Sequence, residues 1–164
     1  MLYLVCGLPG TGKTTVAKEL SSLTGGIVLR TDEIRKQLLS NPQYTPEEKR
    51  LVYDAMLRTA GSMLRAGALV ILDATFHLRK EREAAKDMAG KAGSGHVMIE
   101  VRCDERTVRE HLRKRRVGAD ESDADFGVYK KIEQEWEPLK GEHHVIDISE
   151  KNWRKDLKGI VVKG

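Results

Sequence analysis

"CGLPGTGKTTVAKEL" at Cys6–Leu20 holds the stretch of sequence that decides the fold, "GLPGTGKT" at Gly7–Thr14. A short apolar run precedes it at Leu2–Cys6, and a helical pattern of apolar residues follows it. The stretch satisfies the pattern G-x-x-x-x-G-K-[ST], in which backbone N–H groups of a glycine-rich turn and the positive end of the next helix surround a phosphate. The sequence therefore predicts a phosphate-binding loop, or P-loop, between a strand and a helix.

The residues of this P-loop are expected to bind ATP. They are Gly7, Leu8, Pro9, Gly10, Thr11, Gly12, Lys13, Thr14 and Thr15. Lys13 is the predicted catalytic cation, because the ammonium group of a P-loop lysine reaches the β- and γ-phosphates. The hydroxyl group of Thr14 is the predicted ligand of Mg²⁺, which makes Mg²⁺ the expected cofactor and ATP the phosphoryl donor. The alternative is a glycine-rich turn that contains an incidental lysine.

Strands and helices are expected to alternate along the whole chain. Further strands are predicted over Gly26–Leu29, Leu69–Thr75, His96–Arg102 and His143–Ile148. Helices are predicted over Lys13–Ser22, Asp32–Leu39, Glu47–Arg65, Arg79–Lys91, Glu105–Arg116, Val128–Trp136 and Glu150–Leu157. Strict alternation favours an α/β fold, a three-layer P-loop NTPase sandwich with a mostly parallel sheet of about five strands and a small helical lid. With no linker or repeat in view, we expect a single domain over residues 1–164.

Composition and charge narrow the class of protein. Hydrophobic residues make up 40% and charged residues 33% of the chain, and the formal net charge is +4. These values are typical of a globular protein and permit a phosphate-rich partner without requiring one. We expect no membrane span and no signal peptide, because long apolar runs are missing and the first residues already form a strand. A cytoplasmic enzyme with no evident stable protein partner is the expectation.

A carboxylate follows the most hydrophobic run of the chain. "LVILDAT" at Leu69–Thr75 places Asp73 directly after four apolar residues. In a P-loop protein, a carboxylate at the end of a neighbouring strand binds Mg²⁺ or its water ligands, so Asp73 joins Thr14 as a predicted metal ligand. The alternative role for Asp73 is to cap the turn after the strand, which Thr75 would also do.

A second pair of charged residues follows the second predicted strand. In "RTDEIRKQL" at Arg30–Leu38, Asp32 and Arg35 are three positions apart at a helix start and therefore share a face. A carboxylate there is suited to accept a proton from an acceptor hydroxyl, and the arginine to bind an anionic part of the same acceptor. The spacing is equally compatible with a helix start that Thr31 caps, in which Asp32 complements the dipole and Arg35 is solvated.

Taken in order, "GLPGTGKTT", "TDEIR", "LVILDAT" and the arginine-rich helix after them resemble a family of small predicted P-loop kinases. That family is related to the 5′-kinase domain of phage polynucleotide kinase. The resemblance covers roughly Leu2–Pro138. It implies that Asp32 is the general base, that Arg35 contacts a phosphate of the acceptor, and that Asp73 is the strand-end aspartate. The acceptor site is accordingly assigned to Asp32, Arg35, Asp73 and Thr75.

An arginine stripe occupies the predicted helix "ERTVREHLRKRR". Its members are Arg106, Arg109, Arg113 and Arg116. Kinases of this architecture close a lid whose arginines neutralise charge on the transferring phosphoryl group. We expect the lid over about residues 113–127, and the resemblance places its catalytic arginine at Arg115 or Arg116. The alternative is a solvated basic face, which we favour for Arg106.

The expected function is transfer of the γ-phosphoryl group of ATP to an acceptor hydroxyl, with a polynucleotide or nucleotide 5′-hydroxyl as one candidate. A small-molecule kinase acting on an antibiotic, a sugar or a nucleoside is one alternative. A nucleotide-dependent switch module that is not a kinase is the other. A signalling GTPase is disfavoured, because the guanine-specific pattern N-K-x-D is missing. His77 either lines the acceptor pocket or is a solvated loop residue.

Overall fold

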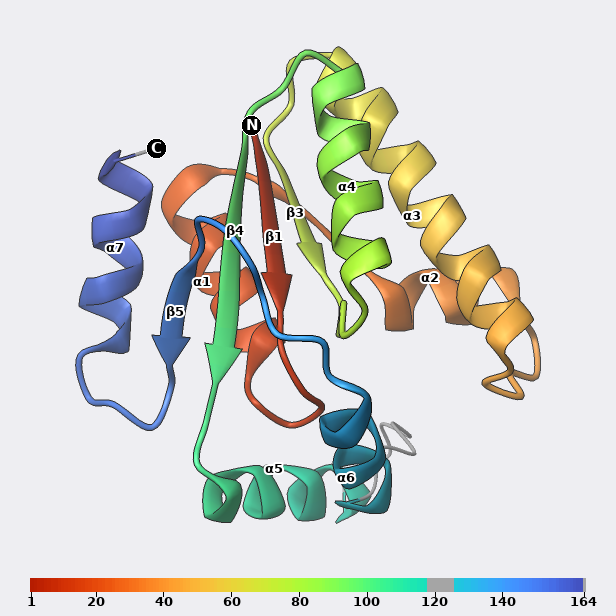
Figure 1. Ribbon diagram of the computed structural model, residues 1–164, viewed down its shortest axis with the longest axis vertical. Coiled ribbons are helices and arrows are strands. Elements are labelled where there is room, and N and C mark those ends of the chain that lie inside the picture. Colours follow the sequence, from red (N-terminus) through yellow and green to blue (C-terminus); the bar gives the residue numbers. More distant parts are fainter. Residues whose placement is uncertain (118–125, 164) are drawn as a thin grey trace.

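The centre of the molecule is a five-stranded sheet, seen in a computed structural model (Figure 1). The structure describes residues 1–117 and 126–163, except for the side chains of residues 115–117 and 163. The strands are β1 (Leu2–Cys6), β2 (Ile27–Arg30), β3 (Val70–Asp73), β4 (His96–Arg102) and β5 (His144–Asp147). Their order is β2-β3-β1-β4-β5, and every pairing is parallel. The predicted α/β fold is confirmed.

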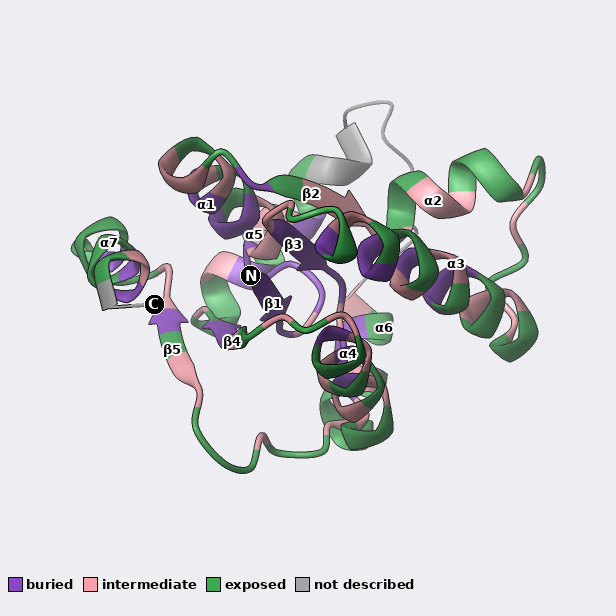
Figure 2. Cartoon of the chain, turned by 90° about the horizontal axis from the view of Figure 1, so that it is seen from above, coloured by how far each residue is buried: buried purple, intermediate pink, exposed green. Residues whose placement is uncertain are grey.

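Helices cover both faces of the sheet, as the alternation of elements predicts. Helices α1 (Lys13–Thr24) and α7 (Trp153–Lys163) lie on one face, and α3 (Pro46–Arg65) and α4 (Arg79–Lys91) lie on the other (Figures 1 and 2). Helices α2 (Thr31–Leu38), α5 (Glu105–Val117) and α6 (Phe126–Glu135) lie toward the carboxyl ends of the strands (Figure 1). Three of the described helices therefore lie toward the end of the sheet where α/β proteins bind ligands.

The core is divided between the two faces by the alternation of side chains along β1. Leu2, Leu4 and Cys6 pack with α3 and α4, whereas Tyr3 and Val5 pack with α1 and α7. All five of these β1 residues are buried, so β1 is covered on both faces, as a central parallel strand is expected to be. The buried positions in Figure 2 gather on the strands and on the helix faces that turn toward the sheet.

Several helix starts differ from the sequence prediction, among them that of α6, which begins at Phe126 rather than at Val128. Helix α2 begins at Thr31, so Arg30 takes the N-cap position and Thr31 is not the cap. Helix α7 begins at Trp153 and extends to Lys163, whereas the prediction ran over Glu150–Leu157. The reason is packing: Trp153, Leu157 and Ile160 follow helical spacing and bury one stripe against the α1 face. Pro46 stands in the first turn of α3, as predicted.

The predicted lid lies for most of its length outside the described residues, and its role stays a prediction. Within the described ranges, no helix has the length and apolar character that a membrane span requires.

Candidate active site

The P-loop joins β1 to α1 and is built around glycines that no other residue replaces without strain. At Gly7, φ is +154° and a Cβ atom would lie 2.4 Å from the carbonyl oxygen of Val101 on β4. The Gly7 N–H donates to the carbonyl of Thr75 at 3.2 Å. Gly12 has a φ of +88° and stands at the N-cap of α1, where it brings no side chain that would cap the first N–H groups. The first turn of α1 is therefore able to donate to an anion.

Lys13 folds back over the loop that precedes it. Its ammonium group donates to the carbonyl of Leu8 at 2.9 Å, and the hydroxyl of Thr11 donates to the same carbonyl at 2.8 Å. The lysine charge thus lies within the loop whose backbone N–H groups would surround a phosphate. This arrangement is suited to neutralise an anion at the start of α1.

Thr14 and Asp73, the two predicted metal ligands, contact each other, and Arg30 contacts Asp73 as well. The Thr14 hydroxyl donates to Asp73 Oδ2 at 2.7 Å, and Arg30 Nε donates to the same oxygen at 3.2 Å. Arg30 and Asp73 are partners in the β2–β3 register, so both strands end at this point. Burial alone would lower the pKa of the Arg30 guanidinium, but its hydrogen bond to Glu33 and the charge of Asp73 outweigh burial and raise that pKa. Arg30 was not predicted from the sequence; its position just before the D-x-x-R pair is the signal that identifies it.

The Thr14 and Asp73 oxygens fit a magnesium ion. One hydroxyl and one carboxylate are hard oxygen donors, and Mg²⁺ takes one or two such protein ligands when phosphates and water complete its shell. Within the described residues, no group of three or more His, Cys, Asp or Glu side chains is arranged to hold a metal. The site therefore fits a metal that arrives with a nucleotide rather than one held by the protein alone.

Asp32 and Arg35 face each other on α2, in surroundings unlike those of Asp73. The Asp32 side chain is 59% exposed, whereas that of Arg35 is 11% exposed. Arg35 Nη1 lies 3.6 Å from Asp32 Oδ1, and its guanidinium lies 4.8 Å from the ring centroid of Tyr44. Within the described part of the chain, Arg35 Nε is buried and has no hydrogen-bond partner. Arg35 thus keeps donor capacity that an anionic acceptor would use.

The loop after β3 is fixed by residues from other elements. The Thr75 side chain is partly exposed and its carbonyl accepts from the P-loop. Phe76 has a φ of +47°, which is rare for a residue other than glycine. Its N–H donates to the hydroxyl of Tyr53 at 3.2 Å, and the two rings pack edge to face at 5.2 Å. Helix α3 therefore holds the loop that carries Thr75.

His77 is buried, so the alternative of a solvated loop residue is wrong. Only 7% of it is exposed, and three charged side chains from α3, α4 and α6 surround its ring. Lys49 lies 3.4 Å from Nδ1, Glu81 lies 3.8 Å from Nδ1, and Glu135 lies 3.7 Å from Nε2. Burial, followed by the charge of Lys49, lowers the pKa of His77, and the nearby carboxylates only partly oppose this. Because its partners are distant in sequence, no local pattern identifies this network.

Helix α5 packs against the P-loop. His111 Nδ1 lies 2.9 Å from the carbonyl oxygen of Gly10, and the side chains of Val108 and Leu112 face the same glycine. A small apolar cluster joins Leu8 of the P-loop to both helices, α5 and α6. We call α5 and α6 together the α5–α6 unit. Its described contacts place it beside the predicted phosphate site.

The arginine stripe of α5 is only partly described. Arg106 is exposed and pairs with Glu110 at 3.6 Å, which agrees with the solvated alternative. Arg109 pairs with Glu105 at 2.9 Å and lies 3.5 Å from the ring centroid of Phe126, so it connects α5 to α6. The side chains of Arg115 and Arg116 lie outside the described residues, and their catalytic role stays a prediction.

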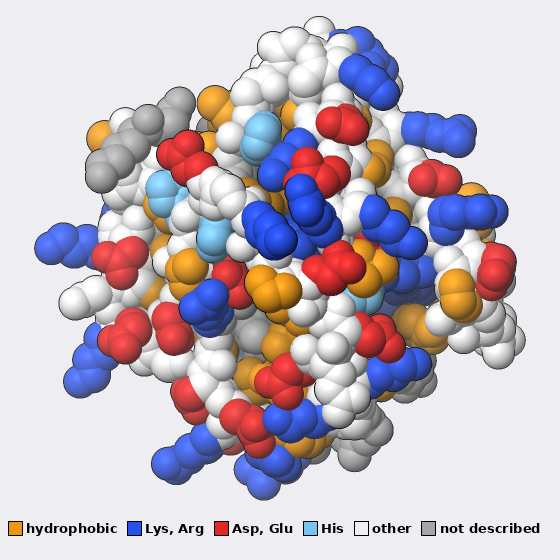
Figure 3. All heavy atoms as spheres, in the orientation of Figure 1, with side chains coloured by type: hydrophobic (Ala, Val, Ile, Leu, Met, Phe, Trp, Pro, Cys, Tyr) orange, Lys and Arg blue, Asp and Glu red, His pale blue; other side chains and the backbone are white. Residues whose placement is uncertain are grey.

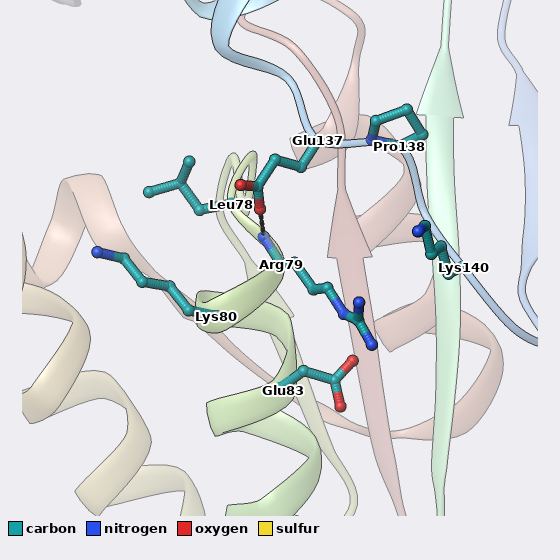
Figure 4. Close-up of a pocket in the computed structure, with 7 residues that line it drawn as sticks. All are labelled: Leu78, Arg79, Lys80, Glu83, Glu137, Pro138 and Lys140. Atoms are coloured by element: carbon teal, nitrogen blue, oxygen red, sulfur yellow. Dashed lines mark hydrogen bonds between the residues drawn. The ribbon is translucent and has the colours of Figure 1, made fainter.

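A cavity of about 690 Å³ opens beside the start of α4 (Figure 4). It is lined by Leu78, Arg79, Lys80, Glu83, Glu137, Pro138 and Lys140. None of these residues belongs to the P-loop or to α2, so this cavity is separate from the predicted nucleotide and acceptor sites. The cavity lies beside the point where the chain after α6 contacts the loop after β3, through the hydrogen bond from the Glu137 N–H to the His77 carbonyl.

The chain matches known proteins at the level of a sequence family. The model of the family AAA_33, an AAA domain, matches residues 2–139. The uncharacterized protein Rv2004c of Mycobacterium tuberculosis (strain ATCC 25618 / H37Rv) is 34% identical over 114 residues, which cover 62% of this chain and 22% of that protein. The matched region thus spans about a fifth of the length of this relative.

Solved structures share the fold at low sequence identity. The crystal structure of APE1195 has a TM-score of 0.79 and 20% identity, and the match covers 99% of this chain and 93% of the other. The APS kinase CysC of Mycobacterium tuberculosis, in complex with AMPPNP and APS, has a TM-score of 0.72 and 16% identity, covering 98% and 95% of the two chains. At these identities the likeness shows the fold alone, which is that of P-loop NTPases. Because the family model matches most of its residues, the chain belongs to the AAA_33 family of AAA domains.

Proposed function

We propose that this protein is an ATP-dependent kinase that transfers the γ-phosphoryl group to an acceptor hydroxyl. One observation carries the proposal: a P-loop lysine, the Thr14–Asp73 pair and the exposed carboxylate of Asp32 follow or end strands β1, β2 and β3 at their carboxyl ends. Charge neutralisation, a metal-binding pair and a proton acceptor are the three parts that phosphoryl transfer requires.

In the proposed mechanism the P-loop N–H groups and Lys13 hold the β- and γ-phosphates of ATP. Thr14 and Asp73 would hold Mg²⁺, which would neutralise further charge on the phosphates. Asp32 accepts the proton of the acceptor hydroxyl at its carboxylate, while Arg35 orients the acceptor through an anionic group. A bond forms between the acceptor oxygen and the γ-phosphorus, the bond to the β–γ bridging oxygen breaks, and ADP leaves.

The surroundings of Arg35 favour one class of acceptor. The guanidinium lies against the ring of Tyr44, and this tyrosine is 53% exposed. An arginine beside an exposed aromatic ring suits an acceptor that carries both an anion and a flat base. On the face in Figure 3, basic and acidic side chains are interspersed, which favours a short acceptor over a long nucleic-acid track. We therefore propose a nucleotide or the 5′-hydroxyl end of a polynucleotide as the acceptor.

An acceptor screen with γ-labelled ATP and Mg²⁺ tests the proposal. The panel contains 5′-hydroxyl DNA and RNA, nucleoside 3′-phosphates, nucleosides, sugars and antibiotics, and Lys13→Ala serves as the control for contaminating kinases. We expect label on 5′-hydroxyl ends or on 3′-phosphate nucleotides with the wild-type protein only. Label on a sugar, a nucleoside or an antibiotic would instead assign the protein to small-molecule kinases. Release of phosphate to water alone would favour a nucleotide-dependent switch.

Arg35→Ala separates acceptor binding from ATP binding. Because Arg35 is proposed to contact the acceptor, the variant is expected to raise the KM for the acceptor strongly and the KM for ATP little. An equal rise in both values would contradict the assignment of Arg35 to the acceptor site.

A further inference from the structure

Arg82 on α4 is a buried arginine with an unusual set of partners. Only 2% of the residue is exposed, although a guanidinium is costly to remove from water unless its donors are satisfied. Nη1 donates to the carbonyls of Phe76 at 2.7 Å and His77 at 3.0 Å. Nη2 donates to the carbonyls of Glu137 at 2.7 Å and Pro138 at 3.4 Å. The two arms of one guanidinium therefore bind two different chain segments.

These segments are distant in sequence and bind each other as well. One is the loop after β3, residues 74–78, which we call the β3–α4 loop. The other, residues 136–138, is the α6 exit segment. The Glu137 N–H donates to the carbonyl of His77 at 3.0 Å, and the Arg79 N–H donates to the Glu137 carboxylate (Figure 4). The Trp136 ring lies 5.8 Å from the Arg82 guanidinium. Arg82 stands at the centre of this junction.

Each segment is also connected to the P-loop. The β3–α4 loop follows Asp73, and its Thr75 carbonyl accepts from the Gly7 N–H. The α6 exit segment ends the α5–α6 unit, which contacts the P-loop through His111 and Gly10. The P-loop, the β3–α4 loop and the α5–α6 unit thus form a closed ring of contacts. Arg82 closes that ring where the β3–α4 loop meets the α6 exit segment.

We propose that Arg82 is a positioning residue that fixes the α5–α6 unit relative to Asp73 and Thr75. The proposal rests on the function proposed above, because it assigns the β3–α4 loop to the acceptor side of a phosphotransferase site. Because Arg82 binds both the β3–α4 loop and the α6 exit segment, the groups on the loop and on the α5–α6 unit stay aligned with a phosphate in the P-loop. Since transfer rates fall steeply with small misplacements, loss of this connection acts on turnover rather than on ATP binding.

Kinetics of Arg82→Lys test the proposal, with Ile160→Ala on α7 as the control for lost stability. Lysine keeps the positive charge, but one ammonium group does not reproduce the two-armed fork that spans both segments. We expect kcat to fall by about 10- to 100-fold with the KM for ATP nearly unchanged, at a temperature where both variants are folded. Ile160→Ala is expected to lower Tm while leaving kcat unchanged. A lowered Tm with unchanged kcat in Arg82→Lys would overturn the proposal.

Hydrogen exchange gives a readout that does not depend on transfer. With AMPPNP and Mg²⁺, we expect slower exchange in both the β3–α4 loop and the α6 exit segment of the wild type, and only in the loop of Arg82→Lys. Slower exchange of both segments in the variant, or of the loop alone in the wild type, would overturn the proposal.

If Arg82→Lys does not fold, Glu137→Ala replaces it, because this substitution removes an exposed contact of the same junction. If exchange slows in both segments of the wild type but the wild type transfers no phosphoryl group, the result would support the positioning role of Arg82 and refute the proposed function.

Discussion

Asp32 and Asp73 are two carboxylates near one edge of the sheet, and their surroundings suit them to different tasks. The Asp73 side chain is 4% exposed and accepts from both Thr14 and Arg30. Asp32 is 59% exposed, and its ion pair with Arg35 is 3.6 Å long. A fixed, hydrogen-bonded carboxylate is suited to a metal, whereas an accessible one is suited to meet a hydroxyl group and take its proton.

Asp32→Asn tests this difference at a single residue. The substitution keeps the size of the side chain but removes the proton acceptor, so turnover is expected to fall by about 10²- to 10⁴-fold. ATP affinity is expected to stay nearly unchanged, since the P-loop is intact. Glu47→Gln in the first turn of α3 is the matched control, because it also removes a carboxylate from a helix start. Steady-state kinetics and nucleotide titration measure both effects; a variant that keeps most of its activity would return Asp32 to a role at the helix start.

His77 predicts a pH dependence of stability. Burial and Lys49 lower its pKa in the folded protein below the ordinary value of 6.5, despite the opposing charges of Glu81 and Glu135. The unfolded chain therefore binds more protons, and this contribution to stability is complete above pH 6.5 and is lost as the pH falls toward the folded pKa. Thermal unfolding at pH 7.5 and 5.5 is expected to show a smaller loss in His77→Gln than in the wild type. Equal losses would mean that other groups cause the dependence.

At the scale of elements, the P-loop depends on how closely it approaches β4. Gly7→Ala places a methyl group against the carbonyl oxygen of Val101 at a φ of +154°, so it combines a backbone clash with strain. Gly67→Ala, after α3, has a φ of +84° but no atom within 4 Å of the new Cβ. The control is expected to lose about 1–2 kcal/mol of unfolding free energy, as for a left-handed residue in general. Gly7→Ala is expected to lose clearly more and to weaken nucleotide binding, as denaturant titrations and binding measurements would show; equal losses would contradict the clash.

Elements whose signal is local were predictable, and those set by distant partners were not. The P-loop is one continuous motif between β1 and α1, and Asp73 ends a continuous apolar strand, so each carries its own signature. Thr14 and Asp73, each predicted as a metal ligand from its own motif, meet because parallel strands end at one edge of the sheet. Arg82 and His77 carry no such signature, because residues from α6 and its exit segment complete their surroundings. In a sequence, a charged residue within a helical pattern indicates a solvated helix face. Only the folded structure shows that carbonyl or carboxylate groups from distant segments surround it.

At the scale of the whole molecule, the candidate site is assembled from elements that are separate in sequence. The P-loop follows β1, Asp32 follows β2, Asp73 ends β3, and α5 follows β4. The parallel sheet brings these ends together, so the candidate site exists only when the chain is folded. The unfolded chain keeps the residues but not their arrangement. A ligand that needs this arrangement binds only the native state and must therefore stabilise the whole fold.

Mg-ATP is accordingly expected to raise the Tm of the protein. Binding to the native state alone at about 100 times the Kd adds about 2.7 kcal/mol. For a domain of this size that corresponds to a rise of roughly 5–10 °C. Lys13→Ala removes the cation from the loop and is expected to show a smaller rise, whereas Lys18→Ala, exposed on α1, is expected to behave like the wild type. Differential scanning fluorimetry with and without millimolar Mg-ATP measures the shift. If the wild-type Tm does not move, the P-loop does not bind this nucleotide, and the proposed kinase loses its donor.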